Sequence, residues 1–131
     1  MEIAPGLVGE IEITVAPADT ADALGNAGVH VLATPRLVAL LEAAAIRAVE
    51  PALGAGAGTV GTRVDVRHLA ATPVGMRVRA RATVREVDGR RLLYDVEAHD
   101  ETERVAEGNH ERFQIDQSRF LARVAAKARR A

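Results

Sequence analysis

The sequence predicts an α+β protein in which a curved antiparallel sheet wraps around one long central helix. Residues 35–49 form an apolar stretch bounded by helix start and stop signals, and the chain from Val60 onward changes to the alternation that is typical of strands. Several such strands follow one another through tight connections, which favours an antiparallel sheet. The chain has 131 residues, of which 48% are hydrophobic. This length and composition suit a single domain over residues 1–131 with a substantial core.

The first half of the chain predicts one strand, a loop and the long helix. Residues 8–16, VGEIEITVA, alternate apolar and polar side chains as a half-buried strand does. Residues 17–33 are mixed and contain glycine and proline, which indicates a loop. We expect Thr34 to be the helix N-cap and Pro35 to occupy the first helical position. Pro51 and the glycines of GAGAG then end the helix.

The second half of the chain predicts four strands and a terminal helix. In VGTRVDVRHLA the alternation places Val60, Val64 and Val66 on one face. TPVG and DGR are turn sequences, and DGR is a strong hairpin signal. The remaining strands are MRVRARATVREV, RLLYDVEAHD and RVAEGNHERFQI, and SRFLARVAAKARR fits a short amphipathic helix with a basic C-terminal end. One helix held in such a sheet is the hotdog arrangement, and its exposed sheet edges predict pairing of two subunits.

The composition excludes several classes of function. The net charge is −1, so no overall field attracts the chain to nucleic acid or to an anionic membrane. Aromatic residues amount to 2%, which argues against base-stacking platforms, and the basic tail RVAAKARR is better explained as a solvated helix end. Cysteine is absent, which rules out disulfides and thiolate sites and fits a reducing compartment. The N-terminus has no secretion-signal pattern, and no apolar run could span a bilayer. We therefore expect a cytoplasmic protein that binds neither nucleic acid nor membrane.

The most informative single residue is Glu42, an acid within the apolar helix. At about 100° per residue, Arg36, Arg47 and Glu50 fall on one stripe, and Glu42 lies about 120° from Arg36. Its neighbours on the helical wheel are apolar. The structural interpretation is a solvated helix edge or an arginine pair, whereas the functional one is a cleft carboxylate kept as a base. A buried charge is costly, so a partner is expected in either case.

His68 is the candidate partner of Glu42. It shares the parity of Val64 and Val66, so it should lie on the apolar face of its strand. A lone histidine there is commonly a hydrogen-bonded core residue. An acid on the helix and an imidazole on the sheet that face one interior nevertheless indicate a site. Thr34 adds a hydroxyl at the helix start, in addition to its expected capping role.

The other histidines are weaker candidates. His30 falls in a loop, His99 lies near a strand end, and His110 is part of GNHER. No spacing among them suggests a zinc site, so we expect no metal. We also expect no cofactor.

The segments LATPRLVALLE, VGTRVDVRHLAATPVGM, VDGRRLLYDVEAHD and EGNHERF resemble the fluoroacetyl-CoA thioesterase-like family of hotdog proteins. The resemblance covers roughly residues 30–116. Its most specific part is the series Thr34, Glu42 and His68, followed by HLAATPVGM. The resemblance implies a homodimer with active sites at the subunit interface, and hydrolysis of a short acyl-CoA thioester, in which coenzyme A is part of the substrate.

The resemblance also implies roles for individual residues. The family's catalytic threonine, glutamate and histidine match Thr34, Glu42 and His68. A glycine near the acyl group matches Gly61, and the arginine of the HER motif matches Arg112. The chain departs from the family at Asn109, where a threonine is usual. It also lacks the phenylalanines with which the fluoroacetyl-specific enzyme lines its pocket before the helix, so the resemblance does not carry that selectivity over.

The mechanism implied by these residues leaves alternatives open. Glu42 could activate a water molecule or attack the carbonyl carbon directly. His68 could orient the nucleophile or protonate the departing thiolate, and Thr34 could position the nucleophile or be acylated itself. Backbone N–H groups near Gly61 or at the helix start could stabilise the oxyanion. The CoA phosphates require cations, for which arginines on the strands are candidates, although a solvated strand face explains each of them equally well: Arg63, Arg67, Arg77, Arg79 and Arg81.

Two other classes of function compete with this interpretation. A non-catalytic acyl-CoA binding or sensing module would keep the fold and the cleft but hydrolyse nothing. A hotdog hydratase would place an aspartate and a histidine on one short segment, and this pattern is absent from the sequence.

Overall fold

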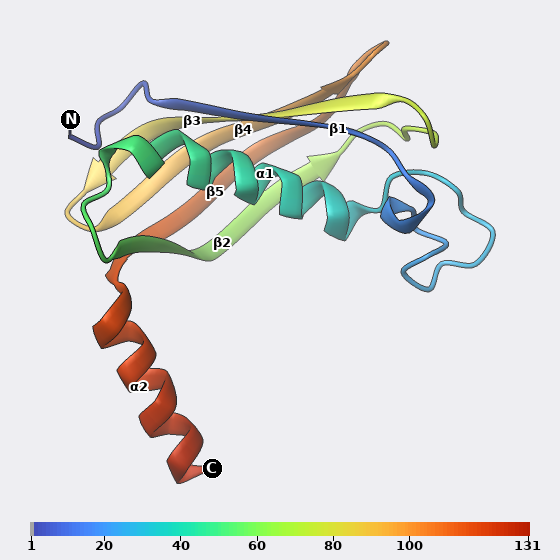
Figure 1. Cartoon of the computed structure of the whole chain (residues 1–131). Helices are drawn as coiled ribbons and strands as arrows, with labels where there is room; N and C mark the ends of the chain where they lie inside the picture. Colours follow the sequence, from blue (N-terminus) through green and yellow to red (C-terminus); the bar gives the residue numbers. More distant parts are fainter. Residues whose placement is uncertain (1) are drawn as a thin grey trace.

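The computed structural model describes residues 2–131 and shows one five-stranded antiparallel sheet crossed on one face by a long helix (Figure 1). The strand order is β1-β3-β4-β5-β2. The predicted hotdog architecture is therefore confirmed. The elements in chain order are β1 (Val8–Thr14), a 3-10 turn (Pro17–Asp19), α1 (Thr34–Val49), a second 3-10 turn (Glu50–Ala52), β2 (Ala57–His68), β3 (Arg77–Asp88), β4 (Arg91–Asp100), β5 (Arg104–Asp116) and α2 (Gln117–Arg130).

The core lies between α1 and the concave face of the sheet. The inward faces of α1 and β3 are rich in alanine, and small side chains let the helix approach the strands closely. The contact is tightest at Gly9 of β1, where a Cβ atom would clash with the carbonyl oxygen of Ala44. The fully buried residues that fill this layer include Leu37, Leu40, Leu41, Ala44, Val78, Ala80, Ala82, Val84, Tyr94 and Val105.

Helix α1 begins one residue earlier than predicted. Ala33 is the N-cap and Thr34 is already helical, so the prediction of Thr34 as N-cap is wrong. No side chain caps this end of the helix. The hydroxyl of Thr34 instead contacts the imidazole of His68, which leaves Thr34 available for a site.

A β-bulge changes which side chains of β2 point to the inner face of the sheet. The pairing with β5 shifts between Gly61 and Arg63, so Thr62 has no direct partner. Residues that pair across an antiparallel ladder share a face. Val60 pairs with the exposed Phe113 and therefore does not share the inner face with Val64, contrary to the alternation read from the sequence. His68 pairs with the buried Ala106, so it does lie on the inner face.

The inner face of the sheet is only partly covered. Helix α1 packs mainly on β1 and β3 and makes fewer contacts with β2. Val64 of β2 and Ile46 of α1 are consequently 42% and 40% exposed. The uncovered strip runs along β2, which is also an edge strand with unpaired backbone groups.

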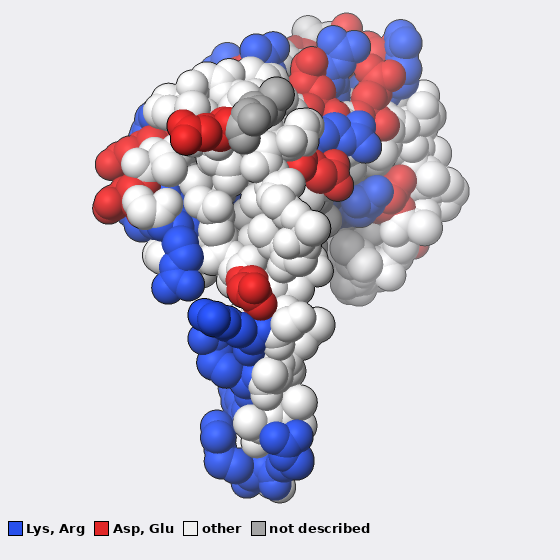
Figure 2. Space-filling view, turned by 60° about the vertical axis from the view of Figure 1, so that its left-hand side comes forward, with Lys and Arg blue, Asp and Glu red and all other residues white. Residues whose placement is uncertain are grey.

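The C-terminal helix α2 extends away from the sheet (Figure 1). It contains no buried residue. Asp116 caps its N-terminus by accepting a hydrogen bond from the backbone of Arg119. Basic side chains gather along one side of the helix (Figure 2). No helix among residues 2–131 is long and apolar enough to cross a membrane.

Candidate active site

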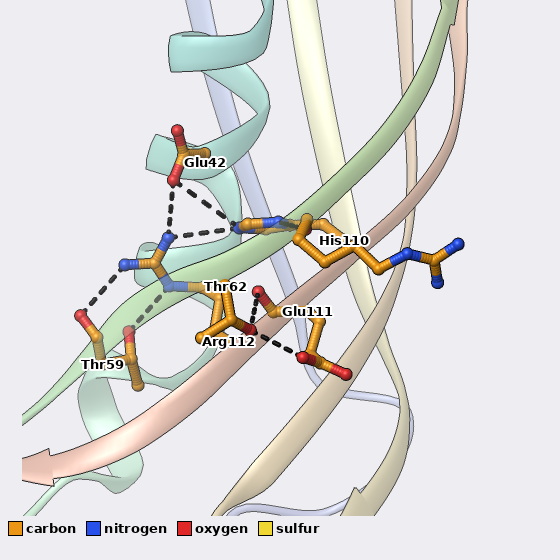
Figure 3. A network of polar contacts seen from close by, with 7 residues as sticks. Glu42, Thr59, Thr62, His110, Glu111 and Arg112 are labelled. Carbon is orange, nitrogen blue, oxygen red and sulfur yellow. Dashed lines mark hydrogen bonds and ion pairs between the residues drawn. The ribbon is translucent and has the colours of Figure 1, made fainter.

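Glu42 of α1 is paired with a buried arginine rather than with His68. Its Oε2 accepts a hydrogen bond from Arg112 Nη1 at 3.0 Å and lies 3.9 Å from His110 Nε2 (Figure 3). Arg112 is 4% exposed, whereas the Glu42 side chain is 38% exposed. The partly exposed carboxylate is thus held by a buried guanidinium through a charge-assisted hydrogen bond, which leaves it within reach of substrate.

The strands β2 and β5 position this cluster. His110 and Arg112 are two residues apart on β5, so both point to the inner face. The bulge at Thr62 places Gly61 opposite Arg112. Thr59 then completes the cradle, since its hydroxyl and its carbonyl oxygen accept hydrogen bonds from Arg112 at 2.9 and 3.0 Å.

Gly61 makes room for the carboxylate. A Cβ atom at this position would lie 2.6 Å from Glu42 Oε2, and about as close to Arg112 and His110 as packing permits, at 3.2 Å from each. Only glycine therefore lets Glu42 reach its partners without displacement. The structure places Gly61 beside Glu42, and its place near an acyl group stays a prediction.

Thr34 and His68 form a second cluster. Thr34 Oγ1 lies 2.7 Å from His68 Nδ1, which joins the start of α1 to the end of β2. Burial lowers the pKa of His68, and the backbone of Ala70 opposes this effect. The imidazole is therefore neutral at pH 7. Its Nε2 is buried without a hydrogen-bond partner among the described residues.

An open groove lies beside the Thr34–His68 pair. Its volume is about 370 Å³. The remaining lining is made of small and aliphatic side chains with one asparagine, and no aromatic residue contributes to it. These residues are Ala21, Asn26, Val29, Val31, Leu32, Leu69, Ala70 and Ala71.

The structure does not bring Glu42 and His68 into contact within one chain. Thr34 and Glu42 are eight residues apart, which corresponds to about 12 Å along a helix. The prediction that His68 supplies the partner of Glu42 is therefore wrong for a single chain, and Arg112 takes that place. The sequence alone makes His110 a weak candidate for the site. The signal that could have identified it is the two-residue spacing of His110 and Arg112, which puts both on one face of a strand.

The strand arginines lie mostly in ion pairs with neighbouring acids on the outer face. Arg63 pairs with Asp65, and Arg79 pairs with Glu12. Both arginines are largely exposed. The solvated-face interpretation fits them better than a dedicated phosphate site. No group of three or more metal-ligating side chains gathers within residues 2–131.

Comparison with known proteins relates this geometry to thioesterases. The family model FlK, described as fluoroacetyl-CoA-specific thioesterase, matches residues 15–118. A fluoroacetyl-CoA thioesterase from Streptantibioticus cattleyicolor is 44% identical over 98 residues, which are 75% of this chain and 70% of that protein.

Solved structures agree with the sequence match. The fluoroacetyl-CoA thioesterase FlK superposes with a TM-score of 0.90 at 36% identity, covering 97% of this chain and 98% of that one. A mutant of that enzyme in complex with fluoroacetate and CoA superposes with a TM-score of 0.84 at 37% identity over 90% of this chain and 99% of that one. A thioesterase superfamily member from Thermus thermophilus gives 0.90 at 30% identity, with 98% and 95% covered.

Proposed function

Because the chain belongs to the fluoroacetyl-CoA-specific thioesterase family, we propose that it hydrolyses the thioester bond of a short acyl-CoA. The observation that carries this proposal is the Thr34–His68 hydrogen bond at the wall of an apolar groove. The groove suits a small acyl group, and the neutral imidazole suits proton transfer. The absence of cysteine from the sequence is compatible with a cytoplasmic enzyme.

In the proposed reaction a water oxygen attacks the thioester carbonyl carbon. Glu42, held by Arg112, accepts a proton from that water. The resulting oxyanion collapses, the carbon–sulfur bond breaks, and the thiolate of CoA leaves. The neutral His68 relays to the sulfur the proton that Glu42 took from water, so both side chains return to their starting protonation states. Direct attack by Glu42 would instead give an anhydride that water then cleaves. Thr34 orients the nucleophile or the imidazole in either route.

We further propose that two copies of the chain complete each site. Within one chain, Glu42 and His68 belong to separate clusters, and the inner face of β2 is uncovered between them. A second copy placed on the β2 edge with two-fold symmetry would cover this strip and bring the Glu42 cluster of one subunit toward the Thr34–His68 pair of the other.

A mixing experiment tests the shared site. His68→Ala and Glu42→Gln homodimers should each lose nearly all activity. If the residues of one site come from different subunits, heterodimers contain one intact site, and subunit exchange in an equal mixture should restore about a quarter of wild-type activity. Light scattering reports the dimer independently. No recovery after verified exchange would show that each site lies within one subunit.

Single replacements test the chemistry itself. We expect Glu42→Gln and His68→Ala each to reduce turnover of the best acyl-CoA by at least about 100-fold, because each removes a proton-transfer group. Release of the CoA thiol measures this turnover. His99→Gln is the matched control, because His99 is exposed on β4. Wild-type rates in both site variants would contradict the proposal.

A substrate panel tests selectivity. Thiol release from acetyl-, fluoroacetyl-, propionyl-, butyryl- and phenylacetyl-CoA should show hydrolysis of small acyl groups. We expect no strong preference for fluoroacetyl over acetyl, because no aromatic side chain lines the groove. Thermal stabilisation by CoA without thiol release from any member would instead favour a binding or sensing module.

A further inference from the structure

We propose that His110 is a positioning residue for this hydrolysis: its neutral ring holds the Arg112 guanidinium, which in turn holds the Glu42 carboxylate in its reactive orientation. This inference rests on the proposed function for its catalytic consequence. The side chain of His110 lies on the buried side of the Glu42–Arg112 pair, away from solvent.

The ring of His110 is held rigidly. The residue is 2% exposed. Nδ1 lies 2.7 Å from the carbonyl oxygen of Arg63 on β2, and the ring stacks on Tyr94 of β4 with centroids 5.9 Å apart. A carbonyl oxygen can only accept a hydrogen bond, so Nδ1 carries the proton. The tautomer is therefore set by the backbone of the neighbouring strand.

This tautomer makes Nε2 an acceptor. Nε2 lies 3.2 Å from Arg112 Nη1, which donates to it. The same Nη1 donates to Glu42 Oε2 at 3.0 Å. Its two hydrogens thus serve the histidine and the carboxylate, while Nε and Nη2 bind Thr59. Removing the acceptor at position 110 would free the end of the guanidinium that holds Glu42.

The surroundings of His110 keep the ring uncharged. Burial lowers its pKa most, the carbonyl of Arg63 opposes this, and the cation of Arg112 lowers the pKa further. Glu42 on α1 and Glu111 on β5 act in the opposite direction. A second proton on the ring, at Nε2, would point at the Arg112 guanidinium, and Nε2 could no longer accept a hydrogen bond from it. Arg112 would then no longer be anchored by His110.

Two variants of His110 separate positioning from packing. His110→Phe keeps an aromatic ring against Tyr94 but has no acceptor. His110→Gln can place a carbonyl oxygen near the position of Nε2. We expect kcat of the phenylalanine variant to fall by about 10- to 100-fold with little change in KM, because a displaced carboxylate affects the chemical step. We expect the glutamine variant to recover most of that loss.

NMR completes the test. Long-range ¹⁵N–¹H spectra of the wild-type protein should show protonated Nδ1 and unprotonated Nε2 at pH 7. The Arg112 Nη1 hydrogens, which bind His110 and Glu42, should give protected signals in wild type and His110→Gln, and these signals should be lost in His110→Phe. His99→Gln should match wild type throughout.

The outcomes are distinct. The Nε2–H tautomer, a charged ring at pH 7, or an unchanged Arg112 signal in His110→Phe would overturn the inference even if thiol release is observed. Equal kcat values in the folded phenylalanine, glutamine and wild-type proteins would also overturn it. The wild-type protein could release no thiol and still show the expected tautomer, with the Arg112 signal lost in His110→Phe. This result would reject the proposed function and the catalytic role of His110, but His110 would still anchor Arg112.

Discussion

At the residue scale, the site depends on the missing side chain of Gly61 as much as on the side chains around it. Gly61 leaves the space into which Glu42 extends, and the carboxylate then meets a buried guanidinium that donates hydrogen bonds from all three of its nitrogens. A charge-assisted hydrogen bond of this kind is stronger than a neutral one and fixes orientation. The orientation of Glu42 therefore depends on residues of β2 and β5 as well as on its own helix.

Adding one carbon atom at Gly61 should disturb this arrangement. In Gly61→Ala the new methyl group would lie 2.6 Å from Glu42 Oε2, so the carboxylate must rotate away from Arg112. We expect thiol release to fall by about 10- to 100-fold, because small misplacements of a catalytic group are costly. The thermal midpoint should change little, since the flexible end of a side chain can move. Unchanged turnover would show that Glu42 acts from another rotamer.

At the element scale, the closest approach in the core is between β1 and α1. Gly9 faces the backbone of Ala44 and Ala48, and a Cβ atom there would meet main chain rather than a movable side chain. The helix must therefore shift if the strand gains any side chain. This contact sets the height of α1 above the sheet, and with it the position from which Glu42 and Thr34 reach their partners.

Gly9→Ala should consequently destabilise the fold. We expect a loss of about 1–3 kcal/mol, because overpacking against rigid backbone forces the elements apart. Urea denaturation measures it. Gly54→Ala is the matched control, because a Cβ atom at that position would meet no atom within 4 Å. Equal stability of the two variants would mean that α1 can shift without cost.

Helix α2 should contribute little to the stability of the sheet. None of its residues is buried, although Gln117 still contacts the sheet through Gly56 and Gly58. A chain that ends at Ser118 should keep its thermal midpoint within about 2 °C of the full-length value, because little surface is lost from the core. Differential scanning calorimetry measures the midpoint. A large decrease would indicate that α2 packs on a second copy of the chain.

At the scale of the whole molecule, much of the fold could be predicted because the local signals agree with the global architecture. Pro35, the DGR turn and the alternating strands each favour the element that forms. The sequence-based predictions are wrong where contacts between distant segments determine the local structure. The bulge at Thr62 reverses the facing of Val60, and Thr34 lies inside the helix, where its hydroxyl contacts His68. The partner of Glu42 depends on the pairing of β5 with β2, and no local sequence pattern predicts this pairing.

The buried His110 and the partly buried His68 make the stability of the molecule depend on pH. Burial lowers the pKa of both His68 and His110 below the ordinary value of 6.5. The unfolded chain therefore binds these protons at higher pH than the folded protein does. The stability that the neutral rings give the folded protein is fully present above about pH 6.5. It is lost as the pH falls toward the pKa values of the two rings in the folded protein.

The midpoint of urea unfolding should decrease steadily from pH 7 to pH 5. His110→Gln should flatten this dependence, because a glutamine does not titrate. The acids with lowered pKa values, such as Asp19 and Asp100, act only below this window. His99→Gln serves as the control. An unfolding midpoint that rises on acidification from pH 7 to pH 5 would contradict the assignment of both rings as neutral.

The projecting basic helix also makes the protein an electric dipole. All 18 acidic residues lie in residues 1–116, together with 12 of the 17 basic ones, and the other five basic residues lie on α2. Residues 1–116 thus carry a net charge of −6 (12 basic and 18 acidic residues) and α2 a net charge of +5. The basic side chains of α2 are visible in Figure 2. Such a molecule aligns in an external field before it makes contact, so an anionic resin should retain it by its tail even above its isoelectric point of about 6.4.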